Sequence, residues 1–281
     1  ARFTNAFAAT PVCSPSRMTW ITGKMPSQHG VQDWLVPNDS FGPKARRWQD
    51  GHNTYSESLA AAGYTLGMVG KWHMGHDDKP QAGFSYWATI PGGGGPYKDV
   101  DILKNGTTVR SPYKTDTFGD IAVDFIGQQR KDKPFYLLMP FYAPHTPFDY
   151  QPETYRDHYA GSKFSCYPRV EQSKQQNRGL ARHHVNEKSM HAYSALISGV
   201  DANIGRVVNR LDEMGLRDNT LVIFTADQGW NAGHHGVWGK GNGTMPQNMY
   251  DTSVKVPCIV AQPGRIPAGV VNADLLSGYD M

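Results

Sequence analysis

The sequence predicts an α/β protein in which a mostly parallel central sheet is sandwiched between helices. Near-continuous apolar, β-branched runs are bounded by turn residues, which is typical of strands buried on both faces of a parallel sheet. Segments with helical periodicity lie between these runs, and such alternation favours an α/β layered fold. The predicted strands are residues 65–70, 135–140, 221–226 and 256–261.

Helices are predicted between these strands. The first spans residues 56–62, and the second spans residues 117–130, with Asp116 as its N-cap. The third runs from about residue 187 to residue 214, because its apolar residues recur at helical spacing. Gly215 follows it, where a helix C-cap is expected.

Loops connect these elements. The chain contains 30 glycines and 19 prolines, which indicates many turns. The sequence Lys-Asn-Gly-Thr at residues 104–107 lies between Ile-Leu and Thr-Val and predicts a tight hairpin. Residues 92–95 are four glycines without the Lys-Ser/Thr of a phosphate-binding loop, so we interpret them as a linker.

Composition excludes several classes of protein. The chain has 281 residues, and its 28 Lys and Arg exceed its 25 Asp and Glu by only three, so no basic footprint for nucleic acid is expected. The longest mostly apolar run, residues 135–143, is interrupted by Pro140 and is far shorter than the roughly 18 residues of a membrane span. Residues 1–12 lack the features of a signal peptide, and we interpret the start of the chain as cut.

Polar residues follow three of the predicted strands. Lys71 and His73 follow the first strand, His145 follows the second, and Asp227 and Gln228 follow the third. Ligands of open α/β sheets bind beyond the carboxyl ends of the strands. The sequence therefore predicts that these side chains meet at one rim, in a site for an anionic ligand and a hard metal.

Cys13 permits three interpretations. It is a small buried residue, or a thiolate nucleophile activated by a helix N-terminus and Arg17, or a modification site. Residues 13–17 read Cys-Ser-Pro-Ser-Arg, and Cys-X-Pro-X-Arg is the sequence recognised by enzymes that oxidise cysteine to formylglycine. Cys166 and Cys258 lack this spacing and are expected to be unmodified.

Five segments in register carry a resemblance to a known family. With them, the chain resembles the sulfatases, the formylglycine-dependent hydrolases of the alkaline phosphatase superfamily, and the resemblance implies an alkaline phosphatase-like fold. It also implies that the family's first strand, which ends in two adjacent Asp residues, and its C-terminal subdomain are missing, so that residues 1–281 are the central part of a catalytic domain. The matching segments are residues 2–17, 63–75, 143–148, 225–229 and 239–257.

The resemblance implies a nucleophile and the groups around it. Cys13, converted to formylglycine and hydrated, would present two hydroxyls: one attacks sulfur, and the other later loses its proton so that sulfate is expelled. Arg17 would hold this diol. Lys71 and Lys240 would bind the sulfate oxygens. His73 would be the partner of the diol during elimination.

Further residues receive roles by the same resemblance. His145 would protonate the departing alcohol oxygen and contact the substrate. For His235, substrate contact and a structural role are both open. Asp227 and Gln228 would bind Ca²⁺ in preference to Mg²⁺. The chain's one Asp-Asp pair, residues 77–78, lies in the wrong place to complete this metal site.

The function predicted from the sequence is hydrolysis of a sulfate ester, with a sulfated carbohydrate favoured over a small aryl or choline ester. The partners are that substrate and, during maturation, a formylglycine-generating enzyme. The resemblance implies a periplasmic or secreted location. Two alternatives stay open: a phosphonate monoester or phosphodiester hydrolase of the same superfamily, and an inactive homologue that only binds.

Overall fold

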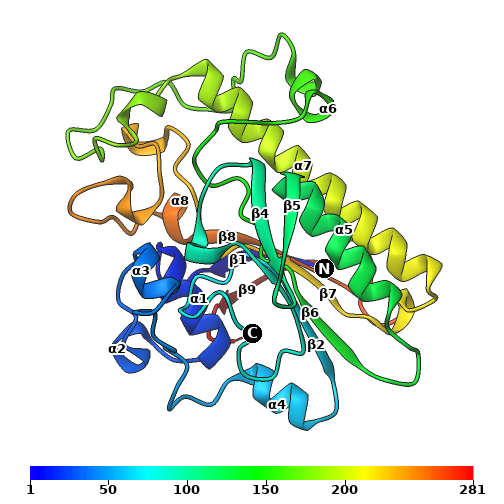
Figure 1. Ribbon diagram of the computed structural model, residues 1–281. Coiled ribbons are helices and arrows are strands. Elements are labelled where there is room, and N and C mark those ends of the chain that lie inside the picture. The colour runs from blue at the N-terminus through cyan, green and yellow to red at the C-terminus, as the bar shows by residue number, and fades with distance from the viewer. Residues whose placement is uncertain (281) are drawn as a thin grey trace. The chain divides into compact units, whose positions relative to one another are not determined.

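Two separate sheets organise the chain in the computed structural model, which describes residues 1–280 (Figure 1). Each sheet belongs to one of two units. Unit 1 contains residues 1–34, 162–191 and the segment from residue 217 onward, and unit 2 contains residues 35–161 and 192–216. We describe each unit by itself.

Unit 1 is built on a four-stranded sheet with the order β7-β8-β1-β9. β1 pairs antiparallel with β8 and parallel with β9, while β7 pairs antiparallel with β8. A small apolar cluster lies on this sheet, centred on Ala6, Val256 and Cys258. The strands are β1 (Arg2–Phe7), β7 (Val222–Thr225), β8 (Lys255–Ala261) and β9 (Val271–Ser277).

The helices of unit 1 are short. The longest that lies wholly within it is α1, and the others are single turns that shape loops. These helices are α1 (Cys13–Thr22), α2 (Pro26–His29), α8 (Asp251–Val254) and the 3₁₀ turns Ala181–His183, Arg217–Asn219, His234–Gly236 and Gly241–Gly243.

Unit 2 is built on a five-stranded sheet with the order β5-β4-β3-β2-β6. β2 is parallel to both of its neighbours, β3 and β6, whereas β4 and β5 are added antiparallel. The strands are β2 (Thr65–Gly70), β3 (Tyr86–Thr89), β4 (Lys98–Lys104), β5 (Thr107–Tyr113) and β6 (Phe135–Leu138).

Two long helices lie side by side in unit 2 (Figure 1). They are α5 (Lys114–Gly127) and α7 (Glu187–Glu213), of which all but the first turn belongs to unit 2. α7 ends as predicted, because Gly215 has a left-handed φ of 61°. The shorter helices are α3 (Pro37–Ser40), α4 (Tyr55–Ala61), α6 (Glu153–Arg156) and the 3₁₀ turns Pro91–Gly93 and Asp157–Tyr159.

The start of α5 differs from its prediction. Asp116 is not the N-cap: the helix begins at Lys114, and Tyr113 precedes it without a side-chain capping bond. The Asp116 carboxylate instead accepts hydrogen bonds from Asn203 at 2.7 Å and from Tyr155 at 2.9 Å. The Asp116 side chain, which the sequence suggested as a helix cap, therefore contacts α7 instead.

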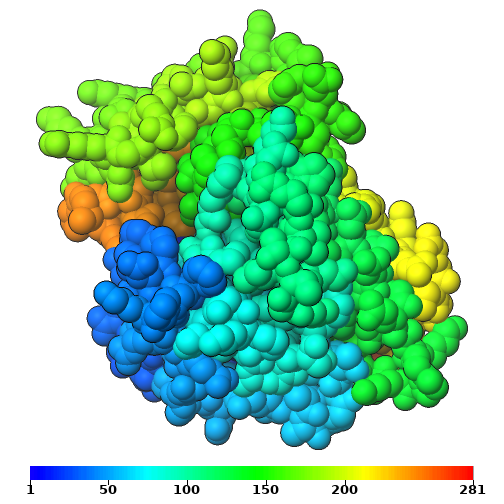
Figure 2. Space-filling model, in the orientation of Figure 1, coloured from blue at the N-terminus to red at the C-terminus, as the bar shows by residue number. Residues whose placement is uncertain are grey.

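The predicted hairpin is confirmed. Asn105 and Gly106, at the turn between β4 and β5, both have positive φ, 49° and 82°, as a two-residue turn of this kind requires. The hairpin carries an exposed ion pair between Arg110 and Asp101, and it lies at the surface in the space-filling view (Figure 2).

The α/β class is confirmed, and each predicted strand corresponds to an observed one. The pairing is more mixed than predicted, since the described strands make three parallel and four antiparallel pairs. β7 also differs from the prediction of burial on both faces: Ile223 is 47% exposed and Phe224 is 37% exposed. Within residues 1–280, no helix combines the length and the apolar character that crossing a membrane requires.

Candidate functional site

Cys13 is the first residue of α1 and is buried, with 3% of its surface exposed. The helix starts here because Val12 is extended and Ser16 donates its backbone N–H to the Val12 carbonyl. No side chain caps this end of the helix. The positive end of the helix dipole therefore points toward Cys13, an arrangement that favours negative charge at this position.

Arg17 lies one helical turn after Cys13 and forms an ion pair with Asp227, whose carboxylate oxygen accepts from Nε at 2.8 Å. Ser16 donates its hydroxyl to the backbone carbonyl of Asp227. Asp227 stands two residues beyond the end of β7. Two bonds from α1 thus attach the Cys-X-Pro-X-Arg segment to the Asp-Gln segment.

Gln228 supplies a second oxygen donor beside Asp227. Its Oε1 is buried and has no hydrogen-bond partner within residues 1–280, which is uncommon for a carbonyl oxygen. Gly229 fixes the turn, because a Cβ there would lie 2.3 Å from the Thr252 carbonyl oxygen. A hard cation would satisfy the Gln228 oxygen and the Asp227 carboxylate.

These two donors fit part of a Ca²⁺ site. Ca²⁺ takes about six to eight oxygen ligands. Among residues 1–280, no cluster of three or more His, Cys, Asp and Glu is arranged to hold a metal ion. Asp227 and Gln228 would supply only part of such a site.

Lys240 is buried, with 4% of its surface exposed, and its Nζ has no hydrogen-bond partner among the described residues. The backbone places it close to the Cys13 segment, since Gly241 donates its N–H to the Pro11 carbonyl at 3.1 Å. Asn248 donates to the Lys240 carbonyl and holds the turn. A buried ammonium group of this kind is a candidate for binding an anion.

His235 is exposed, and its ring stacks on Tyr250 with the ring centroids 4.1 Å apart. Its backbone has a positive φ of 56°. The stacking gives the ring a structural role, while its exposure leaves one face open to solvent. Substrate contact by His235 stays a prediction.

Lys71 follows β2 in unit 2 and is 3% exposed. Its backbone N–H donates to the Pro140 carbonyl at 2.7 Å, and its Nζ lies 5.4 Å from the centre of the Tyr142 ring. Gly70 permits this close approach, because a Cβ there would lie 2.1 Å from the Pro140 oxygen. The loop after β6 therefore adjoins the end of β2.

Three contacts fix the position of His73. Nε2 lies 2.8 Å from the Leu35 carbonyl oxygen and so carries the proton that it donates. The backbone N–H, in a left-handed residue with φ 60°, donates to the buried carboxylate of Asp77 at 3.1 Å. Gly93 packs on the ring: a Cβ there would lie 2.2 Å from the His73 Cδ2.

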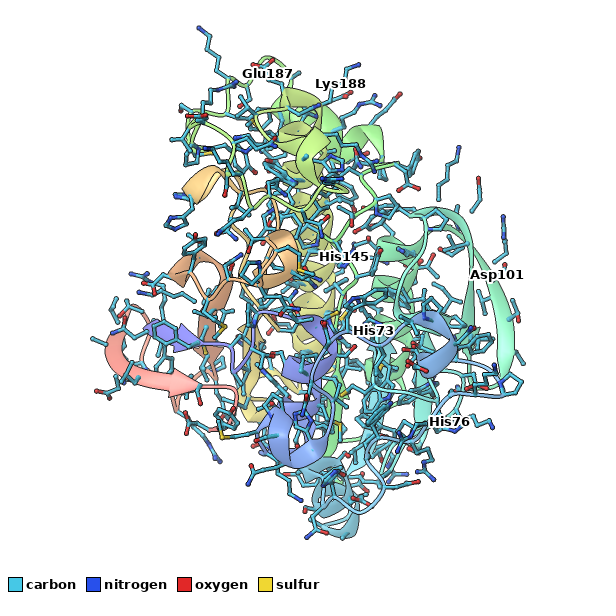
Figure 3. All side chains as sticks on the ribbon, turned by 90° about the vertical axis from the view of Figure 1, so that its left-hand side faces the viewer. His73, His76, Asp101, His145, Glu187 and Lys188 are labelled. Atoms are coloured by element: carbon cyan, nitrogen blue, oxygen red, sulfur yellow. The ribbon has the colours of Figure 1, made fainter. Side chains whose placement is uncertain are left out.

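His145 is fixed by its own loop. Nδ1 lies 2.6 Å from the Thr146 carbonyl oxygen, so Nδ1 carries the proton that it donates. The Tyr97 hydroxyl donates to the His145 carbonyl at 2.7 Å. His73 is buried and His145 is half-buried, and in Figure 3 both lie away from Asp101, which stands at the outer edge on the hairpin.

The predicted residues therefore fall into two groups. Unit 1 carries Cys13, Arg17, Asp227, Gln228, His235 and Lys240. Unit 2 carries Lys71, His73 and His145. Within each group, backbone and side-chain bonds connect the segments as described above.

Two residues that contact His73 were not predicted from the sequence. Gly93 belongs to the stretch interpreted as a linker, yet it packs on His73. Asp77 belongs to the Asp-Asp pair in the wrong place for metal, yet it fixes the backbone of the same histidine. The signal for Gly93 was a run of glycines, which does not reveal what each glycine contacts.

The other two cysteines have ordinary surroundings. Cys258 lies in β8 and is fully buried, and burial raises the pKa of its thiol. Cys166 is exposed in a loop of unit 1. Neither begins a helix, in contrast to Cys13.

Comparison with known proteins gives a family match. The family model described as Sulfatase matches residues 1–278. An N-acetylglucosamine-6-O-sulfatase of Bacteroides thetaiotaomicron is 26% identical, over 99% of this chain and 59% of that protein. An ulvan-active sulfatase of Formosa agariphila is 28% identical, over 93% of this chain and 49% of that protein. The chain thus spans only about half to three-fifths of these relatives.

Solved structures share the fold. A protein solved in complex with its substrate D-glucosamine-2-N,6-O-disulfate superposes with a TM-score of 0.78 at 24% identity, over 99% of this chain and 67% of that chain. A phosphonate monoester hydrolase of Agrobacterium radiobacter superposes with a TM-score of 0.68 at 20% identity, over 99% and 64%. At these identities the likeness is one of fold.

Proposed function

Because the chain belongs to the sulfatase family, we propose that the whole protein hydrolyses a sulfate ester of a carbohydrate, with a nucleophile made from Cys13. The observation that carries this proposal is the attachment of α1 to the end of β7. Through the bonds of Ser16 and Arg17 to Asp227, the modification sequence and the oxygen donors adjoin.

Formylglycine made from Cys13 would supply a hydrated aldehyde as the nucleophile. The residues around it support that role. The uncapped end of α1 favours negative charge at position 13. Arg17 follows Cys13 by four residues, which places both on one face of α1, and its guanidinium would orient the diol.

A bound Ca²⁺ would supply positive charge close to the nucleophile, held in part by Asp227 and Gln228. Oxygen donors of this kind suit Ca²⁺, and Mg²⁺ is the second choice because it demands stricter geometry. The buried Gln228 oxygen without a partner supports this assignment. Lys240, with its buried ammonium, would bind a sulfate oxygen.

Three residues of unit 2 complete the proposed set. Lys71 would bind a sulfate oxygen, and His73 would accept the proton of the diol during elimination. Its ring is suited to that role, because donation from Nε2 to Leu35 leaves Nδ1 as the basic nitrogen. In its imidazolium form, with Nδ1 still bonded to Thr146, His145 would donate the Nε2 proton to the leaving alcohol and contact the substrate.

The proposed substrate is a sulfated sugar. The two relatives described above are named for an N-acetylglucosamine sulfate and for ulvan. We propose that the protein acts in the periplasm or outside the cell, where sulfated polysaccharides are met. A formylglycine-generating enzyme would be its partner during maturation.

The test begins with the mass of the protein. Conversion of Cys13 should lower the mass of the peptide that contains it by about 18 Da, from the exchange of atoms alone. The modified protein should then release sulfate from a sulfated monosaccharide faster than it hydrolyses a phenyl phosphonate ester. A higher rate on the phosphonate would favour the phosphonate monoester hydrolase, and an unmodified, inactive protein would favour the binding homologue.

A further inference from the structure

Lys114 is a buried lysine that the proposed mechanism does not use. It is the first residue of α5, and only 1% of its surface is exposed. A cation is unfavourable at a helix N-terminus, and a buried charge is costly without compensation. Specific contacts are therefore needed to stabilise the buried Lys114 side chain.

Two tyrosine rings provide those contacts. The Nζ of Lys114 lies 3.5 Å from the centre of the Tyr142 ring and 4.6 Å from the centre of the Tyr97 ring. It also donates a hydrogen bond to the Gly95 carbonyl at 2.8 Å. Because burial favours the neutral amine, Lys114 occupies this cage of two aromatic faces and one carbonyl oxygen through its N–H groups.

Charged groups near the cage shift the pKa of Lys114 in opposite directions. Burial lowers the pKa of Lys114 to about 6, the carboxylate of Asp149 raises it, and the ammonium of Lys71 lowers it. Burial also raises the pKa of Tyr97 well above its ordinary value, so this ring of the cage remains a neutral phenol.

The same two tyrosines hold the His145 loop. Tyr97 donates its hydroxyl to the His145 carbonyl, and Tyr142 donates its hydroxyl to the Thr146 carbonyl. The His145 ring lies against Tyr142 with the centroids 4.9 Å apart. Since Lys71 also lies over Tyr142, at 5.4 Å, one ring contacts Lys71, His145 and Lys114.

We propose that Lys114 is a positioning residue: from inside the Tyr97–Tyr142 cage it fixes the tyrosines that orient His145 and Lys71. It does not touch the substrate. The importance of this orientation for turnover rests on the proposed function, whereas the orientation itself can be measured independently. Replacement of Lys114 should release the cage and let the His145 ring change its hydrogen bond.

The experiment compares Lys114→Met with Lys98→Met in the whole protein. Methionine keeps the length and apolar stem of lysine and removes the amine. Lys98 is the matched control, because its Nζ also lies over a tyrosine, Tyr150, at 5.1 Å, but it is exposed. The first measurement is ¹⁵N NMR of labelled histidine, with the His145 signal identified by its loss in His145→Gln.

The wild type and Lys98→Met should show His145 protonated at Nδ1, and Lys114→Met should show a mixture of tautomers. The second measurement is turnover of an alkyl sulfate. Lys114→Met should lower kcat by about tenfold and change KM by less than about threefold, since orientation and not binding is lost.

A wild-type tautomer in folded Lys114→Met would overturn the proposal. If that variant does not fold, Tyr97→Phe decides, because it removes only the hydroxyl that holds the His145 carbonyl. A wild-type His145 signal in Tyr97→Phe would then overturn the proposal, and a mixture would support it. A changed tautomer in a protein whose wild type shows no sulfatase activity would refute the proposed function and leave the positioning role supported.

Discussion

Arg17 and Asp227, which are 210 residues apart in the chain, form an ion pair with Nε 2.8 Å from Oδ2. Their side chains are only 12% and 21% exposed, so the ion pair is largely shielded from water. The carboxylate that is proposed to bind a cation therefore also holds the arginine that is proposed to orient the nucleophile. A change at either residue should affect both roles.

Asp227→Asn should weaken Ca²⁺ binding by about tenfold or more, because it removes a full charge from a hard-cation site. It should also destabilise the protein by about 1–3 kcal/mol, since a mostly buried ion pair with Arg17 is lost. Calorimetric titration with Ca²⁺ and urea unfolding measure the two effects. Asp218→Asn, an exposed carboxylate of the same unit, is the control, and an unchanged Ca²⁺ affinity in Asp227→Asn would refute the metal assignment.

Cys13→Ala should abolish turnover and leave the fold intact, because alanine is a good helix former and only the sulfur is lost. Sulfate release and circular dichroism measure the two effects. Cys166→Ser, at an exposed loop position, should keep its activity. Turnover by Cys13→Ala above about a hundredth of the wild type would contradict the nucleophile assignment.

His145→Ala should discriminate between leaving groups. An alkoxide needs a proton to depart, and loss of a general acid lowers such a rate by about 10²–10⁴. A nitrophenolate departs without help, so its sulfate should be hydrolysed almost as fast as by the wild type. His73→Ala should impair both substrates alike, because regeneration of the aldehyde does not depend on the departed group. Equal losses on both substrates for His145→Ala would mean that His145 binds sulfate or the diol instead.

Lys114 should make stability depend on pH in a predictable direction. Its pKa falls from 10.5 when unfolded to about 6 when folded, so between these values the unfolded chain binds more protons and stability rises with pH. The slope approaches about 1.4 kcal/mol per pH unit for one proton. Lys114→Met should remove this slope, whereas Lys98→Met should keep it. Urea unfolding at several pH values from 6.5 to about 9.5 measures it, and parallel curves for wild type and Lys114→Met would refute the burial of a neutral amine.

The sequence predicted the parts of the fold that local patterns encode. The apolar run 65–70 coincides with β2, and Asn105-Gly106 forms the expected turn, because both signals depend on residues close in the chain. The role of Asp116 could not be predicted this way. Its carboxylate bonds to Asn203 on another helix, and that partner exists only once the chain has folded.

The candidate site likewise contains residues that local sequence patterns reveal and residues that only the folded structure reveals. Cys13 and Arg17 could be recognised because their spacing is a local signal. Lys114 could not, since its burial depends on Tyr97 and Tyr142, which approach it from separate segments. A lysine beside a predicted helix is usually exposed, and nothing in the neighbouring sequence marks this one as an exception.

β7 stands at one edge of the four-stranded sheet, and its apolar side chains reach solvent. An edge strand of this kind exposes backbone hydrogen-bonding groups and apolar side chains, and another extended chain can pair with it. When this chain is prepared alone at high concentration, we expect copies to associate through that edge. Ile223→Lys places a repelling charge there, so light scattering should report fewer aggregates for this variant, which would make it the better starting point for crystallisation.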